Sequence, residues 1–235
     1  MPYLTSKRDT LFIHIPKNGG KFIEDRYGIS DNPSSESNIR NRSFLSKMAR
    51  ILIKADKGNQ QESYDLLKGM LDVGLVTQHL TLMEMQLFNL VPKDIGKINV
   101  FTVVRHPYSR MISLYGHHYK GANKDVDTFE KFCLEFISSD SDLNTRHNII
   151  AHQRTQSEFV RDIYGRVPGS INILRLENLS KELSELDIKL GLHPINKVSS
   201  KSKPNTIENP LLTPRSKRLI YKSYQDDFNL FNYNP

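Results

Sequence analysis

The sequence has a single cysteine, Cys133, so an internal disulfide and a cysteine-rich zinc site are both excluded. No apolar run approaches the ~20 residues that a membrane-spanning helix needs. The first ten residues also lack the apolar core of a signal peptide. These absences together predict a cytoplasmic protein without a transmembrane segment.

Two common site signatures are missing as well. The phosphate loop of kinases, GxxxxGK[ST], would need another glycine ahead of this chain's Gly-Gly pair, and Phe22 stands where its serine or threonine should be. Metal ligands usually recur at short, regular spacings, and four histidines show no convincing spacing with acidic or cysteine partners. We therefore expect no metal at His117, His118, His147 and His152.

The chain has 235 residues, which suits one sizeable α/β domain, and no clear internal boundary is visible. We expect a single domain over residues 1–235, with a polar and basic helical insertion at 31–72. Lys and Arg outnumber Asp and Glu by 33 to 26, a net charge of +7. This balance suits an anionic partner, such as a nucleotide, a sulfated or carboxylated glycan, nucleic acid or a membrane surface. The basic helix expected at 39–57 would suit the rim of a site that attracts such a partner by its positive charge, although a solvated helix face is the simpler interpretation.

Short apolar runs alternate with helical patterns along the chain. An almost wholly apolar run is typical of a strand that is buried on both faces of a sheet. Such runs occupy residues 11–15, 73–77, 99–104 and 171–176. Helical spacing of apolar residues predicts helices at 80–90, 108–119, 126–138, 153–164, from 179 to 190 and at 214–231. This alternation predicts a three-layer α/β/α fold around a central, mainly parallel sheet.

The first apolar run leads into a turn with the features of a phosphate cradle. Pro16 ends the strand because it has no N–H to donate. Lys17 and the pair Gly19-Gly20 follow, and an apolar helical pattern resumes at Phe22. Glycines let the backbone approach an anion, and the N–H groups and dipole of a helix N-terminus favour negative charge. Ordinary turn chemistry explains the same residues, so composition alone leaves both interpretations open.

Later strand ends carry further candidates. Arg105 follows the strand at 99–104, and Ser113 lies two helical turns into the next helix, so the pair could hold a phosphate. A structural ion pair is the alternative for Arg105. His79 follows the short run at 73–77 and therefore lies at the carboxyl end of a strand, where α/β sheets place their ligands. Cys133 falls among helical phenylalanines, which indicates packing and not nucleophilic chemistry.

Four segments together resemble the carbohydrate sulfotransferases that use 3′-phosphoadenosine 5′-phosphosulfate (PAPS), including the heparan sulfate 2-O-sulfotransferases and their bacterial relatives. FIHIPKNGGKF resembles the loop that binds the 5′-phosphosulfate, and FTVVRHPYSRMISLY resembles the motif that holds the 3′-phosphate. ILRLENL and YKSYQDDFNLFNY are similar to the family's later strand and final helix. The resemblance implies a P-loop-like α/β/α fold, PAPS as donor, its product 3′-phosphoadenosine 5′-phosphate (PAP), no metal, and a hydroxyl-bearing acceptor, most naturally a glycan or small molecule and not nucleic acid.

The resemblance also implies a role for each matching residue. Lys17 would be catalytic by contacting the oxygen between sulfate and phosphate, and His79 would be the base that deprotonates the acceptor. The donor-binding residues would be Lys17, Asn18, Gly19, Gly20, Lys21, Phe22, Arg105, Ser113, Lys201 and Lys203. Asn18, Lys21 and Phe22 replace the hydroxyl residues usual in this loop. These departures favour, as an alternative, a non-catalytic module of the same fold that binds anions or glycans; a nucleotide kinase is disfavoured by the missing loop signature.

Overall fold

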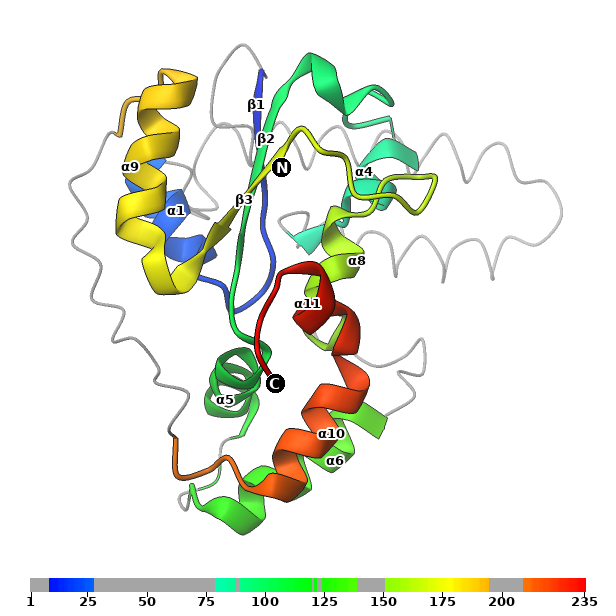
Figure 1. Ribbon diagram of the computed structural model, residues 1–235, viewed down its shortest axis with the longest axis vertical. Coiled ribbons are helices and arrows are strands. Elements are labelled where there is room, and N and C mark those ends of the chain that lie inside the picture. Colours follow the sequence, from blue (N-terminus) through cyan, green and yellow to red (C-terminus); the bar gives the residue numbers. More distant parts are fainter. Residues whose placement is uncertain are drawn as a thin grey trace, which may run out of the picture.

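The structure is a computed structural model that describes residues 9–27, 79–87, 89–119, 121, 124–138, 151–194 and 209–235. The expected strand at 73–77, the insertion at 31–72 with its basic helix at 39–57, and the residues Lys201 and Lys203 lie outside the described residues. The described part has a parallel sheet with helices on both faces, which is the α/β class that the sequence predicts (Figure 1).

The sheet contains β1 (Thr10–Ile13), β2 (Asn99–Val104) and β3 (Ile171–Arg175), in the spatial order β1-β2-β3. Both strand pairs are parallel. All three strands therefore end at the same edge of the sheet, and the segments that follow β1 and β2 leave from neighbouring points. This arrangement places the two candidate phosphate-binding segments next to each other.

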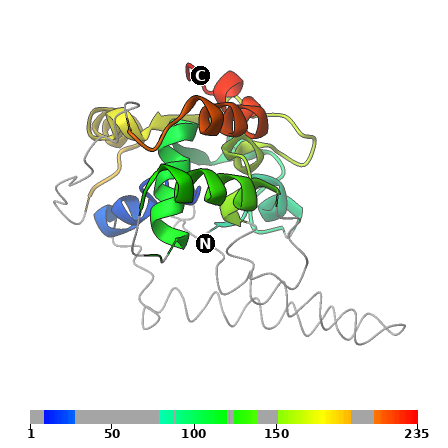
Figure 2. The ribbon, with the colours of Figure 1, turned by 90° about the horizontal axis from the view of Figure 1, so that it is seen from below.

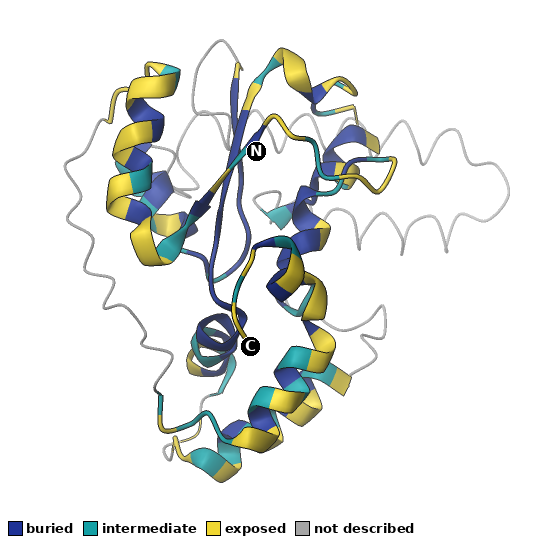
Figure 3. Cartoon of the chain, in the orientation of Figure 1, coloured by how far each residue is buried: buried dark blue, intermediate teal, exposed yellow. Residues whose placement is uncertain are grey.

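Side chains on alternate strand positions enter two separate apolar cores. Leu11 and Ile13 of β1 pack on the face covered by α4 (Leu82–Leu87) and α8 (Gln156–Val160). Phe12 packs on the opposite face, against α1 (Gly20–Tyr27) and α9 (Leu179–Leu190). Figure 3 shows β1 and most of β2 buried, while β3 is partly exposed. Burial on both faces explains why β1 and β2 read as nearly continuous apolar runs.

A third apolar core lies beyond the carboxyl edge of the sheet. It joins α5 (Pro107–His118), α6 (Val126–Ser138), α10 (Pro214–Ser223) and α11 (Gln225–Leu230). α10 lies alongside α6, as both views show (Figures 1 and 2). Cys133 of α6 is fully buried there, and burial raises the pKa of its thiol to about 12, so it packs as an apolar side chain. Within the described ranges, no helix has the length and apolar character that crossing a membrane requires.

Three expected helices are shorter or divided. The helix predicted at 153–164 spans only Gln156–Val160, because a capping box between Thr155 and Glu158 starts it and a turn around Asp162 follows. The helix predicted at 80–90 is Leu82–Leu87. The helix predicted at 214–231 is two helices, α10 and α11, with a break at Tyr224. Short 3₁₀ turns, η2 (Ile95–Lys97) and η3 (Leu176–Asn178), lead into β2 and α9.

Candidate functional site

The loop after β1 turns sharply and enters α1 directly. Lys17 and Gly19 both adopt left-handed backbone conformations, with φ of 69° and 80°, and Gly20 is the first residue of α1. A left-handed lysine is uncommon and requires support from its surroundings. The first N–H groups of a helix have no acceptor within the helix, and here they face the same edge as the ends of β1 and β2. The geometry suits an anion.

Both glycines of this loop are pressed against other side chains. A Cβ on Gly20 would lie 1.8 Å from Nε2 of His14, and a Cβ on Gly19 would lie 2.7 Å from Cδ1 of Leu176. Either side chain would overlap its neighbour. Glycine at these two positions is therefore required for the loop to pack where it does.

Asn18, Lys21 and Phe22, at which this loop departs from the PAPS-binding loops that it resembles, point in different directions. The buried Asn18 side chain turns inward, and its Nδ2 donates to the Val103 carbonyl at 2.9 Å and to Oε1 of Gln156 at 2.6 Å. The Phe22 side chain packs against the core beneath α1 and α9, while Lys21 is exposed. Asn18 and Phe22 thus hold the loop in place with their side chains.

Arg105 and Lys17 lie together at the carboxyl edge of the sheet. Nη1 of Arg105 donates to the Lys17 carbonyl at 3.2 Å. Burial, with Arg105 as a second cause, lowers the pKa of the half-buried Lys17, and burial lowers the pKa of Arg105. Glu177 partly offsets the shift at Arg105. Two cations that destabilise each other in a partly desolvated position favour a shared anion.

The segment after Arg105 is anchored by His106. Its Nε2 donates to the Asn234 carbonyl at 3.0 Å, and its Nδ1 accepts from the Tyr108 N–H at 3.3 Å. This histidine therefore caps the start of α5 and ties it to the end of the chain. Ser113 lies on α5 two turns beyond Arg105 and is half-buried.

His79 lies against the end of β1. Its Nδ1 is 3.2 Å from the His14 carbonyl, which can only accept, so the proton is on Nδ1 and Nε2 carries the lone pair. Burial and the neighbouring His14 lower the pKa of His79 to about 3, so the ring is neutral. The ring of His14 lies edge-on to that of His79, with centroids 4.6 Å apart, and its Nδ1 is 2.8 Å from Oε1 of Glu24. The ring is thus neutral with its lone pair on Nε2, and the same pKa shift makes it a weaker base than a free imidazole.

Two residues that the sequence did not single out organise this edge. Gln156 accepts from Asn18 and from the Arg105 N–H at 2.9 Å, and its Nε2 donates to the Arg105 carbonyl at 2.8 Å. The buried Arg110 donates to the carbonyls of Pro16, His152 and Arg154. The sequence contains one signal for the role of Arg110. It lies one helical turn before the buried Leu114, and it therefore falls on the apolar face of α5, where a charged side chain is unusual.

The sequence model described as the sulfotransferase family matches residues 77–234, which is more than half of the chain. No match was found among curated proteins or among solved structures. The matched range contains His79, Arg105 and Ser113 and excludes the loop with Lys17. That loop is joined to the matched range by the hydrogen bonds of Asn18 and Arg105.

Proposed function

Because the chain belongs to the sulfotransferase family, we propose that it moves a sulfuryl group from PAPS to an acceptor hydroxyl on a carbohydrate. Sulfuryl transfer is the activity of the family, while the donor and the kind of acceptor are our proposals. We also propose that residues 1–235 act as one domain, since β1 and the family-matched strands form one sheet.

The hydrogen bond between Arg105 and the Lys17 carbonyl carries the proposal for the donor. It brings two strand ends with part-buried cations together, as a doubly phosphorylated nucleotide requires. The backbone N–H groups of Gly19, Gly20 and Lys21 suit the 5′-phosphosulfate, and the Arg105 guanidinium suits the 3′-phosphate. We assign Ser113 to that second phosphate. The residues Lys201 and Lys203, outside the described part, are proposed to cover the nucleotide.

The residues at this edge fit an in-line displacement. The bound donor would supply the sulfuryl group, and its phosphate side, PAP, would be the leaving group as the acceptor oxygen bonds to sulfur. Lys17 stabilises negative charge on the departing oxygen as a compact ammonium. His79 accepts the proton of the acceptor hydroxyl at Nε2, because the His14 carbonyl holds the other proton on Nδ1. The His14 carbonyl therefore fixes both the tautomer and the orientation of the base.

One observation favours the alternative, a non-catalytic module that binds anions. Asn18 and Phe22 carry no hydroxyl and turn their side chains into the protein. Neither therefore offers the hydroxyl contact to a phosphate that the PAPS-binding loops resembling this one make. Such a module would keep the cation pair and the helix N-terminus while transferring no sulfate. Donor binding and turnover must therefore be measured separately.

The test combines calorimetry with PAP and a turnover assay with PAPS and a panel of glycans. Arg105→Ala should weaken PAP binding ~10- to 100-fold, because it removes charge-assisted hydrogen bonds. Arg218→Ala, on the exposed side of α10, is the matched control and should leave PAP affinity unchanged. His79→Ala should lower kcat ~100- to 10,000-fold with little change in PAP affinity.

Each outcome decides one point. PAP affinity that is equal in wild type and Arg105→Ala would contradict the donor site. A wild-type kcat in His79→Ala would contradict the assignment of the base. Tight PAP binding with no sulfate transferred to any acceptor would favour the non-catalytic module. Circular dichroism of both variants checks that the fold is retained.

A further inference from the structure

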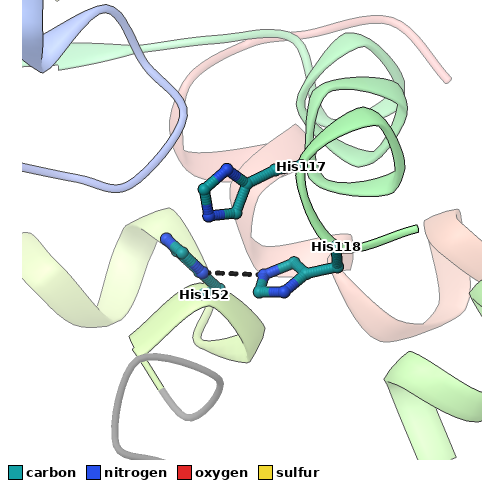
Figure 4. A group of neighbouring side chains, drawn as sticks. All are labelled: His117, His118 and His152. Carbon is teal, nitrogen blue, oxygen red and sulfur yellow. Dashed lines mark hydrogen bonds between the residues drawn. The ribbon is translucent and has the colours of Figure 1, made fainter. Parts of the chain in front are cut away.

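Three histidines from two distant segments of the sequence meet beside the candidate site. His117 and His118 end helix α5, and His152 belongs to the segment 151–153 ahead of α8. One ring nitrogen of each lies within 4.8 Å of those of the other two. Figure 4 shows the three rings turned toward one another, with a hydrogen bond between His118 and His152. Linear spacing did not reveal the group, because His152 reaches it only through the fold.

The hydrogen bond between two of the rings requires a nitrogen lone pair inside the cluster. Nε2 of His118 and Nδ1 of His152 are 2.8 Å apart, so one carries a proton and the other a lone pair. Neutral imidazole nitrogen is a preferred ligand of Zn²⁺, Cu²⁺ and Ni²⁺.

We propose that His117, His118 and His152 form a binding site for a divalent transition-metal ion, with Zn²⁺ as the best fit. Zn–N bonds of ~2.0–2.1 Å in a tetrahedron place the ligand nitrogens about 3.3 Å apart. The present spacings, from 2.8 Å to at most 4.8 Å, require side-chain shifts of the order of an ångström or less at each ring. The proton between His118 and His152 moves to the other nitrogen of the same ring. His117 is exposed, so the ion enters from solvent and water fills the fourth position.

The charges around this three-histidine site are compatible with a cation. A cation, the guanidinium of Arg110, lies beside His152 on the buried side, and its Nη2 donates to the His152 carbonyl at 3.2 Å. Asp227 and Glu158 partly offset the charge of Arg110. The ring of His79 lies 5.8 Å from that of His152, centroid to centroid. A bound ion would tie the end of α5 to the segment that leads into α8.

The experiment uses the full chain without a histidine tag. Zn²⁺ is titrated by calorimetry, and Co²⁺ is added as a spectroscopic probe whose visible bands report tetrahedral nitrogen coordination. His117→Ala removes the exposed ligand and leaves the hydrogen-bonded pair of His118 and His152 in place, and His118→Gln removes another ligand while keeping a hydrogen-bond partner for His152. Each should weaken Zn²⁺ binding at least ~10- to 100-fold. His193→Ala, an exposed histidine elsewhere, is the control and should bind as wild type does.

The site is supported if wild type and His193→Ala bind one Zn²⁺ with a rise in Tm that both ligand variants lose. It is overturned if wild type binds no Zn²⁺, if Co²⁺ gives only weak octahedral bands, or if His117→Ala and His118→Gln bind as tightly as wild type. The readouts involve neither PAPS nor an acceptor. Their failure would therefore leave the proposed sulfuryl transfer untouched, and failure of the PAP titration would leave the metal site untouched.

Discussion

At the scale of single residues, the pair of Glu24 and His14 predicts an unusual dependence of stability on pH. Burial raises the pKa of Glu24 to about 7. The unfolded chain releases this proton near pH 4.5, while the folded chain keeps it up to about pH 7. The contribution of Glu24 to the free energy of unfolding is therefore greatest below pH 4.5, and it decreases as the pH rises to about 7.

Glu24→Gln tests this, because the amide has nearly the same shape and does not titrate. We expect the variant to gain about 1 to 2 kcal/mol relative to wild type between pH 4.5 and 8, less than the full linkage value because solvent and His14 screen the charge. Urea unfolding of both proteins across this range gives the difference. A difference of opposite sign would show that Glu24 is the charged partner of a protonated His14.

Residues at the site differ in how far the sequence reveals them. Lys17 and Arg105 could be proposed because each follows an apolar strand, and parallel strands end at one edge. The roles of His14, Glu24 and Arg110 depend on burial and on partners far along the chain, which no local pattern encodes. The histidine group shows the same limit, since its members come from two segments. The assigned donor-binding and catalytic roles remain predictions until the variants are measured.

At the scale of elements, the short helix α8 depends on a carboxylate from another helix. Oδ2 of Asp227, on α11, accepts from the Gln156 N–H at 2.9 Å, and Oδ1 accepts from the Ser157 N–H at 2.8 Å. Both N–H groups lie in the first turn of α8, where a negative charge is favourable. Asp227 is fully buried and also faces the Arg110 guanidinium.

Asp227→Asn should lower the free energy of unfolding by about 2 to 4 kcal/mol, because one acceptor oxygen and the charge opposite Arg110 are lost. Asp226→Asn is the matched control, since its neighbouring carboxylate is exposed and makes only a 3.5 Å ion pair with Arg161. Urea denaturation of both variants measures the effect. Equal stability of the two variants would contradict a capping role for Asp227.

Helices and strands were predicted with the right bounds where their pattern of apolar residues is long and uninterrupted. The helix at 126–138 and the strand at 99–104 were found with the bounds that the sequence gives, because their apolar positions repeat without interruption. The helix at 153–164 was predicted too long, since the turn held by Asp162 depends on side-chain hydrogen bonds that periodicity does not register. Tyr224 interrupts the last helix although the apolar spacing continues and no glycine or proline stands there; its side chain is buried and its hydroxyl donates to the Gln153 carbonyl at 3.1 Å.

At the scale of the whole molecule, Asn18 joins three segments that are far apart in the sequence. It lies in the loop after β1, and its Nδ2 reaches the Val103 carbonyl of β2 and Oε1 of Gln156 on α8. The loop lies outside the family-matched range and both partners lie within it. The buried amide is therefore one of the side-chain contacts that hold this loop, beside the bonds of Arg105 to the Lys17 carbonyl and of Arg110 to the Pro16 carbonyl.

Asn18→Asp removes the N–H donors without changing the shape of the side chain. Carboxylate oxygens would then face two acceptors, and Gln156 cannot turn its amide round, because its Nε2 already donates to the Arg105 carbonyl. We expect a loss of about 2 to 4 kcal/mol in the free energy of unfolding, together with weaker PAP binding by the folded variant, since the loop shifts away from Arg105. Asn178→Asp, on an exposed asparagine at the start of α9, is the control and should change neither quantity. If Asn18→Asp were as stable as this control, the amide would not be what holds the loop to the rest of the sheet.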